Sequence, residues 1–232
     1  AGDRGKGGLS AGRGMGMNRS VVFDLDGTLI DSLPDLHVAA NRVLADFGAA
    51  PLDLQVLRGF IGHGVPSLVA QVRRARGLPD GLQDQMTAAM LRHYLSAPAD
   101  LTRPYPGVID ALDRLRAEGY RVGLCTNKAM ALTTAILATL DLAHLFDAVI
   151  GGDSLPQRKP HPAPLHAAFA ATGGVPLAFI GDSEVDAETA VAAGLPFGLY
   201  TEGYRKAPVS DVPHRFAFAD FGDLAGLLAG LS

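Results

Sequence analysis

The segment that most constrains this chain is an apolar run that ends in two carboxylates. In the stretch RSVVFDLDGTLIDS, Val21 to Phe23 lead directly into Asp24, and Asp26 follows one residue later. Such a run is typical of a buried strand, and two carboxylates at its end repel each other and lose hydration. A fold retains this pair only where positive charge compensates it, so the sequence predicts a cationic partner for the two acids.

Further short apolar runs predict the rest of a sheet. They read SVVFD, YRVGLCT, FDAVIG, LAFIGD and PFGLY, at residues 20–24, 120–126, 146–151, 177–182 and 196–200. They are almost continuously apolar, which is typical of parallel strands covered on both faces. Helical patterns separate the last four of them. The alternation predicts an α/β fold with a doubly wound parallel sheet.

The alternation is interrupted after the first strand by a purely helical segment. Residues 35–48, 67–77 and 82–95 carry helical periodicity, and Pro and Gly in RPYPGV mark the return to the sheet. We therefore expect an inserted α-helical cap domain at residues 34–103 and a core domain at 17–33 and 104–232. The Gly- and Arg-rich residues 1–16 lack the apolar region of a secretory signal and are expected to form a flexible leader.

Composition excludes several classes of function. The formal net charge of -4 over 232 residues argues against general nucleic-acid binding. No apolar run approaches the length that spans a membrane. The single cysteine, Cys125, is expected to be a core thiol; it permits no intramolecular disulfide, which fits a reducing cytoplasm. Monomer and homodimer both remain open.

The acids at the strand ends favour a hard cation. Asp182 ends the strand 177–182, and Asp186 follows four residues later, near the start of an expected helix. Ligands bind at the carboxyl ends of strands in open α/β sheets, so these acids are expected beside Asp24 and Asp26. Carboxylate oxygens without His or Cys favour Mg²⁺ over zinc or copper.

A second group of residues suits an anion. Thr126 and Asn127 follow the strand 120–126, and Lys159 lies in the proline-rich stretch QRKPHPAPL. A hydroxyl, an amide, a helix start and an oriented ammonium group bind phosphate oxygens well. Lys128, the next residue after Asn127, is expected on the solvated surface, with a substrate contact as the less favoured alternative. Mg²⁺, lysine and carboxylates together indicate phosphoryl transfer.

Four of these segments, in this order, resemble the motifs of the haloacid dehalogenase (HAD) superfamily in its phosphatase branch. They are DLDGT at Asp24, TN at Thr126, the lysine of RKP, and GDSEVD. The resemblance covers the chain from Val21 to about Tyr200 and implies a Rossmann-like core with a helical cap. One such motif is weak evidence, whereas four in order are specific.

The resemblance implies a role for each catalytic residue. Asp24 would be the nucleophile that accepts the phosphoryl group, and Asp26 would protonate the leaving alcohol and then activate water. Thr126, Asn127 and Lys159 would bind the phosphoryl oxygens, and Lys159 would also restrain Asp24.

The resemblance also implies the metal ligands. Asp24, the backbone carbonyl of Asp26, and Asp182 would bind Mg²⁺. Asp186 would contact these ligands without touching the ion, or would bind the ion through a water molecule.

Within the branch, the chain most resembles the phosphoglycolate phosphatases, through the segments RGFIGHG, PYPGV, TNK and KPHPAPL. This resemblance implies a small phosphorylated metabolite, 2-phosphoglycolate, as the substrate. The loop RGFIGHG would then cover it, and Arg58 or His63 would meet its carboxylate.

Related enzymes share much of this pattern, so alternatives stay open. A sugar-phosphate phosphatase or a β-phosphoglucomutase-like enzyme has the same core, and a non-catalytic metabolite-binding regulator could keep it too. A dehalogenase has no need of the acid at Asp26. A phosphonatase needs a cap lysine, and residues 34–103 contain none.

Overall fold

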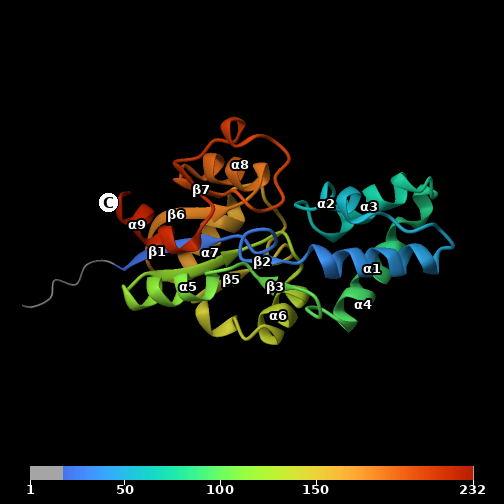
Figure 1. Cartoon of the computed structure of the whole chain (residues 1–232), viewed down its shortest axis with the longest axis horizontal. Coiled ribbons are helices and arrows are strands. Elements are labelled where there is room, and N and C mark those ends of the chain that lie inside the picture. Colours follow the sequence, from blue (N-terminus) through green and yellow to red (C-terminus); the bar gives the residue numbers. More distant parts are fainter. Residues whose placement is uncertain (1–17, 232) are drawn as a thin grey trace, which may run out of the picture.

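The computed structural model of the chain describes residues 18–231, and the leader predicted for residues 1–16 lies outside them. A six-stranded sheet forms the core, in the order β5-β4-β1-β6-β7-β8, with every neighbouring pair parallel. Figure 1 shows this sheet with helices above and below it. The strands are β1 (Arg19–Phe23), β4 (Arg121–Cys125), β5 (Ala148–Ile150), β6 (Val175–Gly181), β7 (Phe197–Tyr200) and β8 (Phe216–Phe218).

Both faces of the sheet are buried, as the continuous apolar runs predict. Val21 and Phe23 of β1 pack on one face, against α5 (Val108–Ala117), α6 (Met130–Thr139) and α9 (Leu224–Ala229). Val22 points to the other face, against α7 (Ala163–Thr172) and α8 (Glu184–Ala193). This alternation along one strand is what lets helices cover both sides. The predicted α/β, doubly wound parallel sheet is confirmed.

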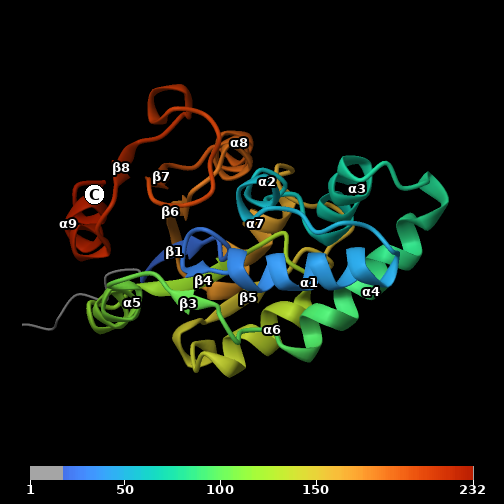
Figure 2. The same ribbon diagram turned by 45° about the vertical axis from the view of Figure 1, so that its right-hand side comes forward.

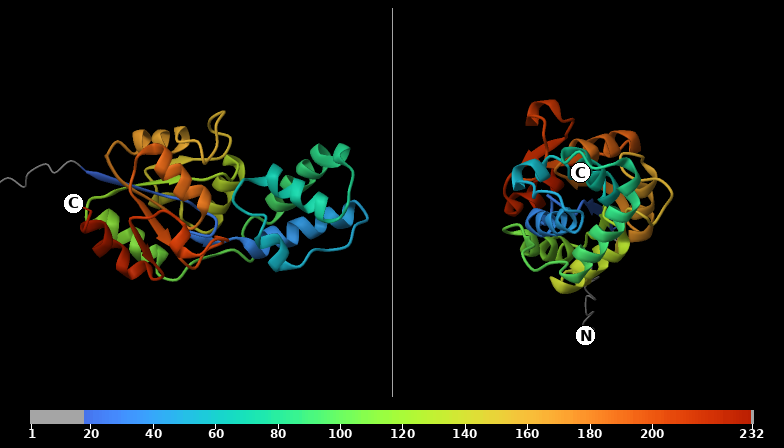
Figure 3. Two further views of the ribbon diagram at one scale, coloured as in Figure 1. Left: turned by 90° about the horizontal axis from the view of Figure 1, so that it is seen from above. Right: turned by 90° about the vertical axis from the view of Figure 1, so that its right-hand side faces the viewer.

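The helical segment at residues 33–96 lies beside the sheet as an insertion (Figure 3). Helices α1 and α4 lie side by side, and α3 packs on α4 (Figures 1 and 2). Apolar side chains of these helices, such as Leu36 and Met90, join the same buried cluster as one face of the sheet. The helices are α1 (Leu33–Asp46), α2 (Leu54–Arg58), α3 (Val65–Ala75) and α4 (Gln83–Ser96).

The two connections between core and insertion pair with each other. Strand β2 (Ile30–Asp31) forms an antiparallel pair with β3 (Arg103–Pro104). Next to this pair, the buried carboxylate of Asp35 accepts hydrogen bonds from the backbone N–H groups of Leu101 and Thr102 and from the Thr102 hydroxyl. One carboxylate therefore ties the start of α1 to the returning chain. The domain boundaries after residue 33 and before residue 104 stay predictions.

Several short elements were not predicted. The pair β2–β3 and the edge strand β8 have only two or three residues per strand. Short 3₁₀ helices lie at Asp80–Leu82, Ala143–Leu145, Val209–Asp211 and Phe221–Asp223. Within residues 18–231, none of the helices is long and apolar enough to cross a bilayer.

Candidate active site

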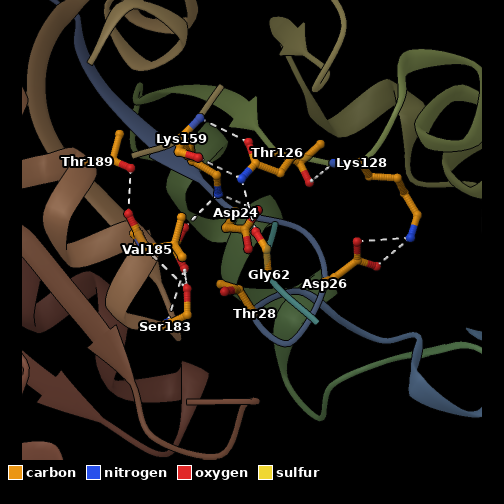
Figure 4. Close-up of polar contacts among 12 residues, drawn as sticks. Asp24, Asp26, Thr28, Gly62, Thr126, Lys128, Lys159, Ser183, Val185 and Thr189 are labelled. Carbon is orange, nitrogen blue, oxygen red and sulfur yellow. Dashed lines mark hydrogen bonds and ion pairs between the residues drawn. The ribbon is translucent and has the colours of Figure 1, made fainter. Parts of the chain in front are cut away.

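The carboxyl ends of three neighbouring strands bring the candidate residues together. Asp24 follows β1, Thr126 follows β4 and Asp182 follows β6. They line a cavity of about 350 Å³ between this sheet edge and the cap loop at residues 61–65. Figure 4 shows Asp24, Thr126 and Lys159 converging at the end of the sheet. The topology thus produces the juxtaposition that the motif order predicts.

Lys159 is the ammonium group that faces Asp24. It lies in the loop between β5 and α7, and its side chain is only 2% exposed. Its Nζ lies 2.8 Å from Asp24 Oδ1 and 2.6 Å from Asp186 Oδ1. The sequence predicts a cationic partner for Asp24 and Asp26, and for Asp24 this partner is Lys159.

Three buried carboxylates form a cluster with too little positive charge. Oxygen atoms of Asp24, Asp182 and Asp186 lie within 4.8 Å of one another. Burial raises the pKa of Asp24 to about 7, although Lys159 opposes the shift. Burial, and then repulsion from Asp186 and Asp24, also holds the pKa of Asp182 well above its usual value. Such a cluster binds protons or a cation, and its all-oxygen donor set fits a hard divalent ion.

The carboxylate of Asp182 is held from both sides. Thr28 Oγ1 donates to Asp182 Oδ1 at 2.9 Å, and the backbone N–H of Tyr204 donates to Oδ2 at 2.5 Å. Gly27 has a φ of +87°, and a Cβ there would come within 2.5 Å of the carboxylate. The turn DGT therefore needs glycine for both its conformation and its contact with Asp182.

Asp186 combines a capping role with its ion pair. It occupies the third position of α8, where its carboxylate accepts from the N–H and hydroxyl groups of Ser183. Ser183 in turn caps the helix, which completes a reciprocal capping box. The other carboxylate oxygen of Asp186 accepts a hydrogen bond from Lys159 Nζ, so α8 fixes the position of this ammonium group.

Asp26 has a different environment from the three clustered acids. Its side chain turns away from Asp24 and towards Lys128, as Figure 4 shows. Lys128 Nζ donates to both carboxylate oxygens, at 2.7 and 2.9 Å, and Ser32 Oγ donates to one of them. A third donor of the same ammonium group reaches Tyr94 Oη of α4 at 3.0 Å.

The expectation that Lys128 lies on the solvated surface is wrong. Its side chain is 3% exposed, because the cap helix α4 covers it with Tyr94. The neighbouring acid and phenol hold the pKa of Lys128 above its usual value, despite its burial. A pair of buried ammonium groups, Lys128 and Lys159, therefore faces the acids.

Thr126 and Asn127 both line the cavity but differ in what they contact. Thr126 Oγ1 accepts from the backbone N–H of Lys128 at 3.2 Å, which leaves its own proton for another acceptor. The amide of Asn127 exchanges hydrogen bonds with the Lys159 backbone and also donates to the Gly62 carbonyl of the cap loop at 3.0 Å. Asn127 therefore joins the lysine loop to the cap.

The two cap residues suggested for substrate contact lie in different places. His63 is exposed and lines the cavity. Arg58 is outside the cavity lining; its guanidinium donates to the Gly203 carbonyl and lies 5.8 Å from the centre of the Tyr204 ring. The cap is thus attached to the core loop after β7 through Arg58.

Comparison with known proteins identifies the family. The model of the haloacid dehalogenase-like hydrolases matches residues 19–194. The chain belongs to the haloacid dehalogenase-like hydrolases. It is 53% identical to a phosphoglycolate phosphatase of Cereibacter sphaeroides strain ATCC 17029, over 91% of this chain and 98% of that protein. A phosphoglycolate phosphatase of Rhodobacter capsulatus is 44% identical, over 92% and 98%.

A solved structure supports the same assignment. The crystal structure of a predicted phosphoglycolate phosphatase from Haemophilus somnus 129PT superposes with a TM-score of 0.86 at 30% identity, covering 92% of this chain and 99% of that one. This haloacid dehalogenase-like hydrolase therefore shares both core and cap with a solved relative.

Sequence reasoning missed several residues that build the site of this hydrolase. Thr28 lies inside the first motif and Ser183 inside the fourth, so their polar side chains were a usable signal. Tyr204 offers none: it lies far along the chain, yet its hydroxyl accepts from the backbone N–H groups of Ser32 and Leu33 at the start of α1.

Proposed function

We propose that this chain is a phosphoglycolate phosphatase, a phosphoric monoester hydrolase that converts 2-phosphoglycolate and water to glycolate and phosphate. The observation that carries the proposal is the buried contact of Lys159 with Asp24, beside an acid cluster, at the base of a cavity covered by the cap. The high identity to phosphoglycolate phosphatases over almost the whole chain supports the choice of substrate.

In the first chemical step, an Asp24 oxygen attacks phosphorus and the bond from phosphorus to the bridging oxygen breaks. Asp26 donates a proton to that oxygen, so glycolate leaves as an alcohol. An aspartyl-phosphate on Asp24 results. Lys159 holds the attacking carboxylate in place through its 2.8 Å contact.

In the second step, water attacks the phosphorus of the aspartyl-phosphate. Asp26 now accepts the proton of the water, the acyl phosphate bond breaks, and phosphate and free Asp24 are released. The same carboxyl group thus acts first as an acid and then as a base. Asp26 lines the same cavity as Asp24, and its carboxyl group would turn from Lys128 towards the substrate to act in either step.

The phosphoryl oxygens require donors around Asp24. We assign them to the free hydroxyl proton of Thr126, to Lys159 and to Asn127, all of which line the cavity. Charge that develops on these oxygens in the transition state would then meet oriented donors.

The acid cluster suits Mg²⁺. Asp24, Asp182 and the backbone carbonyl of Asp26 would hold it, with Asp186 behind them or acting through water. When bound, the ion would neutralise charge on the phosphoryl oxygens and on Asp24. The raised pKa of Asp24 and that of Asp182 support a cation here, because burial, together with the neighbouring carboxylates, makes the ionised form of each acid unfavourable without one.

The remaining expectations stay predictions. His63 and Arg58 are the cap residues proposed to meet the substrate, and His63 has the better position because it lines the cavity. We further propose a cytoplasmic location and a monomer or homodimer.

Phosphate release tests the function directly. The protein is assayed with 2-phosphoglycolate, β-glucose 1-phosphate and p-nitrophenyl phosphate, each with Mg²⁺ and with EDTA. We expect kcat/KM to be highest for 2-phosphoglycolate and turnover to stop in EDTA. A higher kcat/KM for the sugar phosphate, or formation of glucose 6-phosphate, would favour a sugar-phosphate phosphatase or a mutase. Binding without hydrolysis of any compound would indicate a regulator.

A further inference from the structure

The buried ammonium group of Lys128 lies on the wall of the active-site cavity but has no role in the two chemical steps. It is positioned by its contacts with Asp26 on one side and Tyr94 on the other. The ring of Tyr94 also faces it, with Nζ 4.7 Å from the ring centre. A buried lysine held this firmly at a cavity wall is suited to bind an anionic group of a ligand.

The placement of Asp26 decides which ligand group this is. If Asp26 protonates the bridging oxygen of the substrate, that oxygen lies within hydrogen-bond reach of the carboxyl group. In 2-phosphoglycolate a single methylene separates this oxygen from the carboxylate. The ammonium group of Lys128, which contacts Asp26, would therefore be a buried cation close to the substrate carboxylate.

The hydrogen bonds of Lys128 allow one of its N–H groups to move from Asp26 to a ligand carboxylate. Two of its three N–H donors go to the same carboxylate, that of Asp26, which Ser32 also contacts. One donor can turn to a ligand carboxylate while Asp26 keeps the other donor and the serine hydroxyl. The other cationic side chains in the described part of the cavity lining fit less well. Lys159 contacts Asp24 and is assigned to the phosphoryl group, and the side chains of His63 and Lys206 are exposed.

We propose that Lys128 is the specificity residue that binds the carboxylate of the substrate, and that Tyr94 of the cap positions it. The proposal rests on the proposed function and deepens it: the enzyme selects phosphomonoesters with a carboxylate one carbon from the ester oxygen. Because Tyr94 belongs to α4, the carboxylate pocket is complete only when the cap covers the core.

Paired ligands that differ in the carboxylate alone test this proposal. The first pair is 2-phosphoglycolate and 2-hydroxyethyl phosphate, compared by kcat/KM. The second pair, 3-phosphonopropionate and propylphosphonate, is not hydrolysed and is compared by its inhibition constants. In Lys128→Gln, we expect the preference for the carboxylated member of each pair to fall at least tenfold. An equal loss on both members of a pair would overturn the proposal.

Matched variants show which side chain is responsible for the preference for carboxylated ligands. Lys206→Gln changes an exposed residue of the same cavity lining and should change the preference less than threefold. His63 is the rival for the carboxylate, so His63→Asn is measured beside it. A larger fall in preference in Lys206→Gln or His63→Asn than in Lys128→Gln would assign the carboxylate to that residue and overturn the proposal. Tyr94→Phe keeps the ring and the lysine, and should lower the preference by a smaller factor. If Lys128→Gln does not fold, an unchanged preference in Tyr94→Phe would overturn the proposal.

The two inhibitors separate this proposal from the proposed function. If the wild-type enzyme does not prefer 2-phosphoglycolate as a substrate, the proposed function fails. Tighter binding of 3-phosphonopropionate than of propylphosphonate, lost in Lys128→Gln, would still establish the carboxylate site. Equal binding of the two inhibitors by the wild-type protein would overturn the site whatever the substrate.

Discussion

Lys159 and Asp186 form a buried ion pair of 2.6 Å that joins the loop before α7 to the first turn of α8. The same ammonium group contacts Asp24, so one lysine neutralises part of two carboxylates. Both contacts are almost fully hidden from solvent. Asp186, which also caps α8, therefore holds the side chain of Lys159 in one position.

Replacement of Lys159 by methionine should affect stability and turnover together. Two buried carboxylates would lose their partner, which costs about 3–5 kcal/mol in the free energy of unfolding of the metal-free protein. Loss of a charged donor at the phosphoryl group should lower kcat roughly 10²–10³-fold. Urea denaturation in EDTA and phosphate release measure the two effects. Arg114→Met, which breaks an exposed pair on α5, is the control. Equal losses in both variants would contradict the prediction.

Metal binding should stabilise the protein through the acid cluster. A ligand that binds only the folded state at 100 times its Kd adds about 2.7 kcal/mol to the free energy of unfolding. We expect Mg²⁺ to raise the melting temperature of the wild-type protein, and Asp182→Asn to abolish most of this increase. Differential scanning fluorimetry with and without Mg²⁺ measures it. The exposed Asp113 of α5 supplies the control variant, Asp113→Asn. A full Mg²⁺ effect in Asp182→Asn would place the metal elsewhere.

The stability of the metal-free protein should fall as pH rises. Burial raises the pKa of Asp24 from 3.8 to about 7, so between these values the folded protein retains a proton that the unfolded chain has lost. The folded state therefore gains stability at low pH and loses it as pH rises through about 7. Urea denaturation in EDTA, at several pH values across this window, should give a shallower slope for Asp24→Asn than for the wild type. Identical slopes would show that Asp24 does not carry the shift.

The joint between core and cap should depend on Asp35. Asp35→Ala would leave the backbone N–H groups of Leu101 and Thr102 without their buried acceptor, at a cost of about 1–3 kcal/mol or more. Thermal denaturation measures this loss, with Asp113→Ala as the exposed control. A loss no greater than that of the control would show that the joint does not need this carboxylate.

The strand ends of the core could be predicted because sequence and topology agree there. The apolar runs 20–24, 120–126 and 177–182 each end at a polar residue, and parallel strands place those residues at one edge. Asp24, Thr126 and Asp182 could therefore be placed together from the sequence. Lys159 followed from the motif order. The environment of Lys128 did not, because its partner Tyr94 is 34 residues away on a cap helix. No local sequence pattern predicts which cap residue contacts which residue at the strand ends.

Other features could not be predicted because the elements are too short, or because the residues in contact are far apart in the sequence. Strands β2 and β3 have two residues each, too few for a periodicity, and they form because the two cap connections run side by side. Tyr204 joins Asp182 to the start of α1 through its backbone and its hydroxyl. It lies in an irregular loop, where neither helical nor strand patterning applies.

The central claim is that Asp24 carries the phosphoryl group during turnover. The most direct test is rapid acid quenching of the protein during turnover of 2-phosphoglycolate labelled with ³²P, followed by mapping of the labelled peptide. We predict label on the peptide that contains Asp24 and none in Asp24→Asn, which should also lack turnover. Label on another residue, or an Asp24→Asn variant that still releases phosphate, would contradict the claim.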